Sequence, residues 1–426
     1  MKNIFKQIIS DFHSIERKKV IKRELEVPLN SQKIISIIWP RRSWKSYFLY
    51  SIINDLIKLW INKTNIVFIN FEDERINING NQLQVIIDAY LELYNEKKLK
   101  NVYFFFDEIQ NITWWEKFVR RIYDSDIKNI FITWSNAKLL SKEISTHLRG
   151  RSLSYEILPL SFKEYLFFKQ IDTNFNRTKN KAKIINLQKD YLLRWWFPEI
   201  INFPIELKIK TLQEYFDVMI YNDIIERYKI KNTNILKNFI KHILQSTTKE
   251  YSINKIWNKL KNLWLRFDKN DLYDYIEYLD IIYFWKSISK YEYALSKQTL
   301  KKFYIFDNWF LNAITFQFSN NYWKLLENLV FIELYKKFWE NIFFLKNWSE
   351  TDFIINYKEN LIFQVCYNLN DENMKREINW CIDAMKKFRL TSAYIITFEE
   401  EGIIKIKWKN IQVIPYYKWC LEEPLP

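Results

Sequence analysis

Residues 34–46 read Ile-Ile-Ser-Ile-Ile-Trp-Pro-Arg-Arg-Ser-Trp-Lys-Ser, and this stretch decides the fold. Ile34–Ile38 is almost continuously apolar, which is typical of a buried parallel strand. A helical pattern then runs from Lys45 to Leu59. Lys-Ser opening a helix after such a strand is the second half of the phosphate-binding P-loop, G-x-x-x-x-G-K-[ST]. The candidate phosphate-binding residues are therefore Trp39, Pro40, Arg41, Arg42, Ser43, Trp44, Lys45 and Ser46.

Both glycine positions of this motif, 39 and 44, hold tryptophan. The loop folds its backbone amides around phosphate, which requires positive φ or close backbone approach, and glycine supplies these at least cost. An indole at Trp44 would fill the phosphate position. The literal sequence therefore predicts a loop that cannot bind phosphate.

Two carboxylates complete a candidate site. The apolar run Val102–Phe106 is followed at once by Asp107 and Glu108. We expect Asp107 to hold Mg²⁺ with Ser46, and Glu108 to polarise the attacking water. An Asp-Glu pair after a strand is otherwise an ordinary solvated turn. Lys45-Ser46 about 60 residues upstream, with strands in the right order, favours the site.

The regions around this site predict an α/β fold with a doubly wound parallel sheet. Further strands are expected at 66–71, 130–133 and 153–158, with helices between them. We predict an N-terminal helix and basic connector (1–30), the sheet core (31–160), a helical lid region (161–245), a winged-helix-like region (246–310) and a small α/β domain (320–426).

The glycine deficit extends beyond the loop. The chain has 3 Gly and 18 Trp in 426 residues, whereas about 7% Gly, roughly 30 residues, is ordinary. Tryptophan also stands at other predicted turns or corners, namely Trp134, Trp195, Trp196, Trp264, Trp309 and Trp348. We hypothesise that the codon UGA, read here as tryptophan, encodes glycine, and that Trp115 and Trp419 are genuine. The alternative is a real tryptophan-rich protein.

Composition narrows the class of protein. A hydrophobic fraction of 48% and a charged fraction of 27% exclude disordered and low-complexity classes. No apolar run reaches the roughly 18 residues of a membrane span. The three cysteines also lack the spacing of disulfides or of metal sites. We therefore expect a cytoplasmic protein. The net charge of +15 fits a nucleic-acid partner and, equally, an A/T-rich codon bias that adds lysine everywhere.

The chain resembles the prokaryotic AAA-type ATPases that carry a restriction-endonuclease-like C-terminal domain of unknown function. The matching segments are 39–46, 106–110, 115–118, 132–135, 148–151, 159–162, 195–199, 327–330, 352–353 and 376–378. The resemblance covers nearly the whole chain.

This resemblance implies binding and hydrolysis of ATP with Mg²⁺, and Lys45 on the β- and γ-phosphates. It places Ser135 and Asn136 at the polar sensor position near the γ-phosphate. Arg149 or Arg151 would be an arginine finger in a homo-oligomer, or else a salt-bridged surface residue. The resemblance names no substrate, so the partner protein is unknown.

Two C-terminal regions have their own alternatives. In residues 251–306 the second helix of the predicted winged helix carries four carboxylates, Asp271, Asp274, Glu277 and Asp280, and one lysine, Lys269. Such a helix would repel phosphates, so we favour a role in packing between domains over recognition of DNA.

The nuclease-like C-terminal domain has part of a nuclease's metal-binding set. Asp352 is in place, with Glu327 or Glu333 on the preceding helix. The next strand reads Gln364-Val365-Cys366 where a nuclease needs Glu/Asp-x-Lys, so we expect no nuclease activity.

Three functions remain open at this point. The first, which we favour, is an ATPase acting as a switch or remodeller of an unknown target, provided that positions 39 and 44 are glycine. The second is a non-catalytic scaffold for nucleic acid or protein, in which Trp39 and Trp44 are genuine. The third is a nuclease effector.

Overall fold

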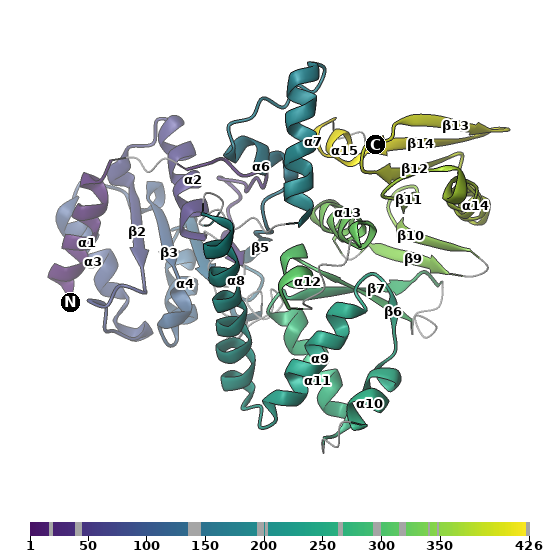
Figure 1. The fold of residues 1–426 in the computed structure, drawn as a ribbon. Coiled ribbons are helices and arrows are strands. Elements are labelled where there is room, and N and C mark those ends of the chain that lie inside the picture. The colour runs from purple at the N-terminus through teal and green to yellow at the C-terminus, as the bar shows by residue number, and fades with distance from the viewer. Residues whose placement is uncertain are drawn as a thin grey trace. The chain divides into compact units, whose positions relative to one another are not determined.

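The structure is a computed structural model of residues 1–426. It describes residues 1–16, 20–38, 45–134, 146–193, 200, 203–262, 267–292, 300–314, 321–339, 341–346 and 349–422. The chain divides into two compact units, Met1–Leu158 and Pro159–Pro426, and each is described by itself. Figure 1 labels their helices and strands.

The first unit contains a five-stranded sheet in the order β2-β3-β4-β1-β5, in which every neighbouring pair is parallel (Figure 1). Its strands β1, β3 and β4 are buried along their whole length, as their continuous apolar runs require. The predicted α/β fold with a parallel sheet is confirmed. The bounds are β1 (Ile34–Ile38), β2 (Ile66–Asn70), β3 (Tyr103–Asp107), β4 (Ile130–Trp134) and β5 (Ser152–Glu156).

Helices cover both faces of this sheet: α1 (Lys2–Ser14), α2 (Lys45–Lys58), α3 (Gln84–Leu93) and α4 (Trp115–Asp124). Alternate residues of a strand point to opposite faces. Phe68 of β2 contacts α1 through Phe12 (ring centroids 5.6 Å apart) and α2 through Tyr50 (4.9 Å). On the other face, Phe104 and Phe106 of β3 contact Tyr90 of α3 and Phe118 of α4.

The second unit begins with helices, as predicted for residues up to about 245. They are α6 (Phe162–Phe168), α7 (Thr178–Leu193), α8 (Ile205–Ile220) with a π-helical continuation (Tyr221–Glu226), and α9 (Thr233–Gln245). The later helices are α10 (Ile253–Lys261), α11 (Lys269–Ile281), α12 (Asn308–Ile314), α13 (Tyr322–Phe338), α14 (Asp371–Phe388) and α15 (Tyr416–Glu422). Trp309, which we expected in a turn, lies in α12 and is buried.

A nine-stranded sheet runs through the rest of this unit in the order β13-β14-β12-β11-β10-β9-β7-β8-β6. Strands β7 and β8, in the region where a wing was predicted, pair antiparallel, and β7 also pairs in parallel with β9. The regions 246–310 and 320–426 therefore share one sheet. The strands are β6 (Glu250–Tyr251), β7 (Trp285–Lys290), β8 (Lys301–Ile305), β9 (Ile342–Lys346), β10 (Glu350–Ile355), β11 (Leu361–Val365), β12 (Ser392–Thr397), β13 (Gly402–Ile406) and β14 (Lys409–Pro415).

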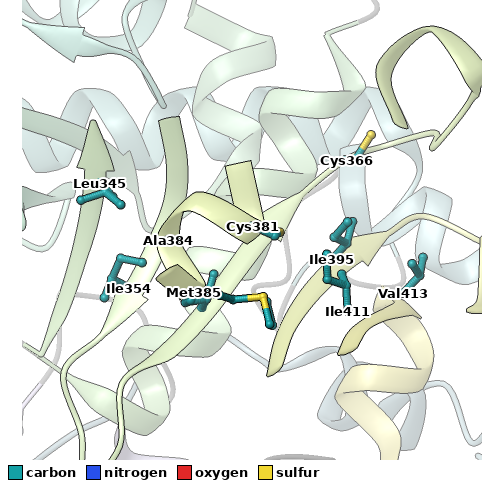
Figure 2. Close-up of a cluster of buried hydrophobic side chains, with 11 residues drawn as sticks. Leu345, Ile354, Cys366, Cys381, Ala384, Met385, Ile395, Ile411 and Val413 are labelled. Carbon is teal, nitrogen blue, oxygen red and sulfur yellow. The ribbon is translucent and has the colours of Figure 1, made fainter. Parts of the chain in front are cut away.

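Helix α14 packs against this sheet and closes a hydrophobic core (Figure 2). Cys381, Ala384 and Met385 of α14 are completely buried among strand residues such as Ile354 and Ile395. Cys381 and Cys366 are both free thiols. They therefore serve here as small apolar side chains.

Among the residues that the structure describes, no helix combines the length and the apolar character needed to cross a membrane.

Candidate functional site

The first candidate site lies where β1, β3 and β4 end. Strand β1 ends at Ile38 and helix α2 begins at Lys45, as the P-loop pattern predicts. Residues 39–44 between them, which include Trp39, Pro40, Arg41, Arg42, Ser43 and Trp44, lie outside the described residues, as does the side chain of Lys45. Because β4 and β1 are neighbours and β3 lies next to β4, the carboxyl ends of all three strands meet at one edge of the sheet. Ligands of open α/β sheets bind at this edge.

The two predicted Mg²⁺ ligands are in direct contact at this edge. The hydroxyl of Ser46, in the first turn of α2, donates a hydrogen bond of 2.5 Å to Oδ2 of Asp107, the last residue of β3. Asp107 is fully buried. A carboxylate and a hydroxyl suit Mg²⁺, which is usually held by one or two carboxylates together with substrate phosphates. No group of three or more His, Cys, Asp or Glu side chains in the described part of the chain could hold a metal alone.

Glu108 follows Asp107 in an unusual backbone conformation. Its φ is 54°, in the left-handed region, and its side chain is buried. Its backbone N–H donates a hydrogen bond of 2.8 Å to Oγ1 of Thr133, and Gln110 Nε2 donates one of 2.5 Å to its Oε2. A non-glycine residue in this conformation costs about 1–2 kcal/mol, and such residues concentrate at functional sites.

Thr133 links the Asp107 carboxylate to the Glu108 backbone and was not among the predicted site residues. Its hydroxyl donates a hydrogen bond of 2.5 Å to Asp107 Oδ1 and accepts the one from the Glu108 amide. Thr133 is fully buried in β4. In the sequence it appears only as a hydroxyl residue at the end of the apolar run Ile130–Ile132 and as part of the matching segment 132–135.

Tyr50 is a second unpredicted neighbour of this site. Burial, followed by the nearby Asp107 carboxylate, raises the pKa of Tyr50 to about 12. The phenol of Tyr50 therefore stays protonated and neutral at physiological pH.

The predicted sensor residues, Ser135 and Asn136, lie outside the described residues. Arg151 forms an ion pair with Asp124, with Nε–Oδ1 at 2.9 Å and Nη2–Oδ2 at 3.1 Å. This is the surface pair that we considered as the alternative to an arginine finger. Arg149 is exposed, has φ of 51° and makes no ion pair with any described residue.

A second group of charged side chains lies on β8, β10 and α13 in the second unit. The Lys302 side chain of β8 is 1% exposed, and its ammonium lies 2.7 Å from Glu350 and 3.8 Å from both Glu327 and Asp352. Burial opposes its charge, but these carboxylates raise the pKa of Lys302 above its ordinary value. Burial raises the pKa values of Glu327 and Asp352 as well. Glu333, the other predicted candidate, pairs with Lys336 instead.

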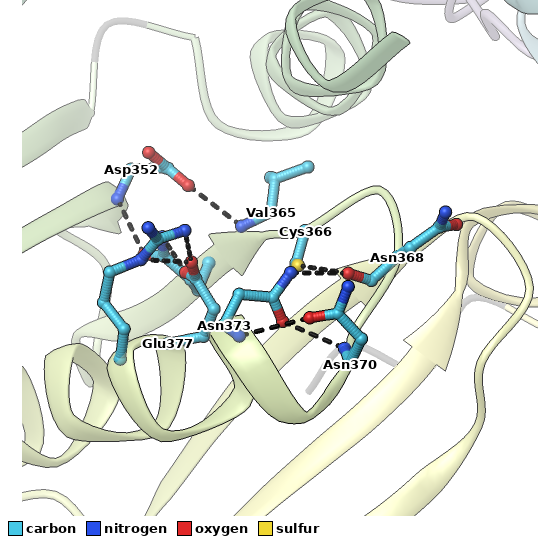
Figure 3. Close-up of polar contacts among 9 residues, drawn as sticks. Asp352, Val365, Cys366, Asn368, Asn370, Asn373 and Glu377 are labelled. Atoms are coloured by element: carbon cyan, nitrogen blue, oxygen red, sulfur yellow. Dashed lines mark hydrogen bonds and ion pairs between the residues drawn. The ribbon is translucent and has the colours of Figure 1, made fainter.

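Gln364, which we compared in sequence with the metal-binding carboxylate of a nuclease, takes part in a buried hydrogen-bond network. Its Oε1 accepts a hydrogen bond of 3.2 Å from the Asp352 amide, and its Nε2 donates one of 2.8 Å to Glu377. Figure 3 shows that Asp352 also accepts a hydrogen bond from the Val365 amide. A glutamate at 364 could not donate to Glu377, so the glutamine fits this network as it stands.

Comparison with known proteins places the first unit among AAA domains. A family model described as an AAA domain matches residues 31–166, which include all five strands of the parallel sheet. A model described as a domain of unknown function (DUF8612) matches residues 185–341. The predicted AAA-type P-loop ATPase fold is therefore confirmed, and the nuclease-like domain stays a prediction.

Two curated relatives match nearly the whole chain. One is the uncharacterized protein MJ1544 of Methanocaldococcus jannaschii, which is 39% identical over 438 residues, covering 99% of this chain and 96% of that protein. The other is an uncharacterized protein of Haemophilus influenzae, which is 30% identical over 400 residues, covering 92% of this chain and 94% of that protein. Among solved structures, the Walker-type ATPase PABY2304 of Pyrococcus abyssi aligns with a TM-score of 0.41 and 14% identity over 74% of this chain and 95% of that chain.

Proposed function

This chain belongs to the family of the uncharacterized protein MJ1544 and carries an AAA domain, and from this premise we propose that it binds ATP with Mg²⁺ and hydrolyses it. The observation that carries the proposal is the contact of Ser46 with Asp107 beside Glu108, at the carboxyl edge of a parallel sheet. Hydrolysis would drive a switch or remodelling step on a target that is still to be identified.

Each residue of the site has a proposed role. Lys45 binds the β- and γ-phosphates, and Ser46 and Asp107 hold Mg²⁺, which supplies positive charge to the phosphates. Glu108 accepts a proton from the attacking water, and Asn136 contacts the γ-phosphate. Arg149, exposed and without an ion pair among described residues, is the arginine finger of a homo-oligomer.

The binding step is tested by calorimetry with ATP and Mg²⁺ on protein with glycine at 39 and 44. We expect binding that Lys45→Ala abolishes or weakens strongly, because a phosphate-facing ammonium is lost. Lys58→Ala, at the far end of the same helix, is the matched control and should bind normally. The literal tryptophan form should not bind ATP. Failure of the glycine form to bind would favour the non-catalytic scaffold.

The proposal includes the reading of most tryptophans as glycine, and the end of α2 supports it. Trp60 has φ of 65° and is 95% exposed. Its N–H donates to the Ile57 carbonyl (3.1 Å), and the Ile61 N–H donates to the Leu56 carbonyl (3.1 Å). This pair of hydrogen bonds is the Schellman motif, whose left-handed residue is usually glycine. A tryptophan there has the steric cost of a Cβ and gains almost no burial.

The end of α13 supports the same reading. Trp339 has φ of 52° and ψ of −123°, a combination that lies outside the regions open to L-residues, and it is 44% exposed. Trp115 and Trp419, expected to be genuine, are each 2% exposed. Trp134, expected at the corner after β4, is the last residue of that strand and is buried. It therefore lends the hypothesis no conformational support, and neither does buried Trp309.

Peptide masses of the protein purified from its own cells test this reading. We expect glycine masses at positions 39, 44, 60 and 339, and tryptophan masses at 115 and 419. Tryptophan at 39 and 44 in the native protein would contradict both the reading and the ATPase proposal that depends on it.

For the C-terminal α/β region we propose a nuclease-like fold without nuclease activity. Gln364 replaces a metal-binding carboxylate, and the Lys302 ammonium already pairs with Glu350 and lies close to Glu327 and Asp352, where a metal ion would need to sit. We expect no cleavage of plasmid DNA in Mg²⁺ or Mn²⁺. Cleavage that disappears in Asp352→Ala would refute this.

A further inference from the structure

Charge is separated between the consecutive helices α9, α10 and α11 of the second unit. Residues 229–262, which include α9 and α10, contain eight lysines, and Glu250 is their only carboxylate. The next helix, α11, carries four carboxylates and one lysine. A codon bias toward lysine would raise the lysine content of every surface, but it would not remove carboxylates from two helices and concentrate them on a third.

Helices α9 and α10 pack together, and we call the exposed lysines on and just beside them the basic face. Helix α9 presents Lys237 and Lys241 one turn apart, and α10 presents Lys255 and Lys259 in the same way. Burial and then the Lys259 ammonium lower the pKa of His242, so Lys259 of α10 lies near His242 of α9. The basic face consists of Lys231, Lys237, Lys241, Lys255, Lys259 and Lys261.

These six lysines are exposed, and none of them forms an ion pair with a residue that the structure describes. The one carboxylate of the segment, Glu250, is paired with Lys346 at 3.0 Å. Asparagine side chains that can donate hydrogen bonds lie between the lysines, at Asn234, Asn254 and Asn258. Lysine and asparagine side chains on rigid elements are the groups that contact phosphate and sugar in nucleic-acid complexes.

Neither α9 nor α10 presents an exposed aromatic ring, which favours a duplex over a single strand. Single-stranded nucleic acid is bound largely by stacking on exposed aromatic rings. The aromatic residue of α10, Trp257, is half-buried beneath the Lys261 ammonium, 4.9 Å from its ring centroid. Recognition of bases in the major groove by α11, the expected recognition helix, is disfavoured. Its carboxylates Asp271, Asp274 and Glu277 would repel the DNA phosphates.

We propose that the basic face binds the phosphate backbone of double-stranded DNA without reading its sequence. This site uses α9 and α10 rather than the expected recognition helix. It does not depend on nucleotide binding, because all of its residues lie in the second unit. Its failure and that of the ATPase proposal are therefore distinguishable.

The test is fluorescence anisotropy with a labelled DNA duplex and the full chain at several salt concentrations. One variant combines Lys237→Gln, Lys241→Gln, Lys255→Gln and Lys259→Gln. The matched control combines Lys179→Gln, Lys183→Gln, Lys189→Gln and Lys405→Gln, four exposed lysines of the same unit that form no ion pair within the described ranges. Both variants lose the same net charge. Circular dichroism and thermal unfolding confirm that both are folded.

We expect the basic-face variant to bind about 100-fold more weakly near physiological salt, and its slope of log affinity against log salt to fall by about 3–4. The control should keep the affinity and slope of the unmodified chain, and duplexes of different sequence should bind equally. Equal losses in both variants, or no duplex binding at low salt, would overturn the proposal. So would a change of self-association in the basic-face variant while its DNA binding is intact, because the face would then join two copies of the chain.

Discussion

At the scale of single residues, the hydroxyl of Thr133 orders the candidate active site. It donates to the Asp107 carboxylate and accepts from the Glu108 amide, so one side chain fixes both acidic residues. Because Glu108 has a left-handed φ of 54°, its position depends on contacts that hold this conformation. Thr133 acts on the reaction through its neighbours and is a positioning residue.

Replacement of Thr133 tests this arrangement. Thr133→Val keeps the shape of the side chain but removes the hydroxyl, and we expect kcat for ATP to fall about 10- to 100-fold, as for other residues that orient ligands of a metal. The apparent affinity for Mg²⁺ should fall as well, because Asp107 loses a hydrogen bond. Thr133→Ser restores the hydroxyl and should restore most of both. Equal kinetics of the valine variant and the parent would show that the hydroxyl orders nothing.

Sequence reasoning found some of these residues and missed others for a physical reason. Ser46 and Asp107 follow from local patterns, a lysine and hydroxyl residue at a helix start and a carboxylate at a strand end. Thr133 depends on β4 lying next to β3, which is a property of the sheet order and not of any local stretch. Gln110, which holds the Glu108 carboxylate, likewise has no local pattern to distinguish it.

At the scale of elements, continuous apolar runs predicted β1, β2, β3 and β4 closely, because burial on both faces leaves that pattern. The edge strand β5 is only partly buried. The two-residue strand β6 and the C-terminal strand β14 were not predicted. The parallel pairing of β7 with β9 was also missed, since it joins residues about 50 positions apart without a turn pattern. That pairing joins β7 and β8 to the C-terminal strands in one sheet.

Lys302 connects three of these elements, since it lies on β8 and contacts carboxylates on α13 and β10. Lys302→Met keeps a long apolar side chain but leaves the buried carboxylates without a counter-charge. We expect a loss of about 3–5 kcal/mol in the free energy of unfolding, measured by urea denaturation. Lys301→Met, on the opposite face of the same strand and only half-buried, should change stability by less than about 1 kcal/mol. Similar losses in both variants would contradict a special role for Lys302.

The same cluster predicts a pH dependence. Burial raises the pKa values of Glu327 and Asp352 in the folded state, so the folded chain binds more protons than the unfolded chain above the ordinary carboxyl pKa. Their contribution to stability therefore decreases as pH rises through that range. Removal of the ammonium raises these pKa values further. The destabilisation by Lys302→Met should be larger at pH 8 than at pH 5, and an effect that is constant with pH would exclude this electrostatic cause.

At the scale of the whole molecule, the proposed chemistry is divided between the two units. The first unit carries the predicted ATP site, and the second carries the basic face and the buried Lys302 cluster. The net charge of +15 did not by itself distinguish a nucleic-acid partner from codon bias. The placement of lysines and carboxylates on separate helices favours the proposed nucleic-acid partner, and the structure adds that the lysines of α9 and α10 are exposed.

ATP turnover by the full chain with glycine at 39 and 44 tests the central claim most directly, with Glu108→Gln as its partner variant. We predict Mg²⁺-dependent release of phosphate by the glycine form. Glu108→Gln should bind ATP normally but hydrolyse it at least about 100-fold more slowly, because water loses its proton acceptor. An unchanged rate in Glu108→Gln, or no turnover by a glycine form that binds ATP, would contradict the account.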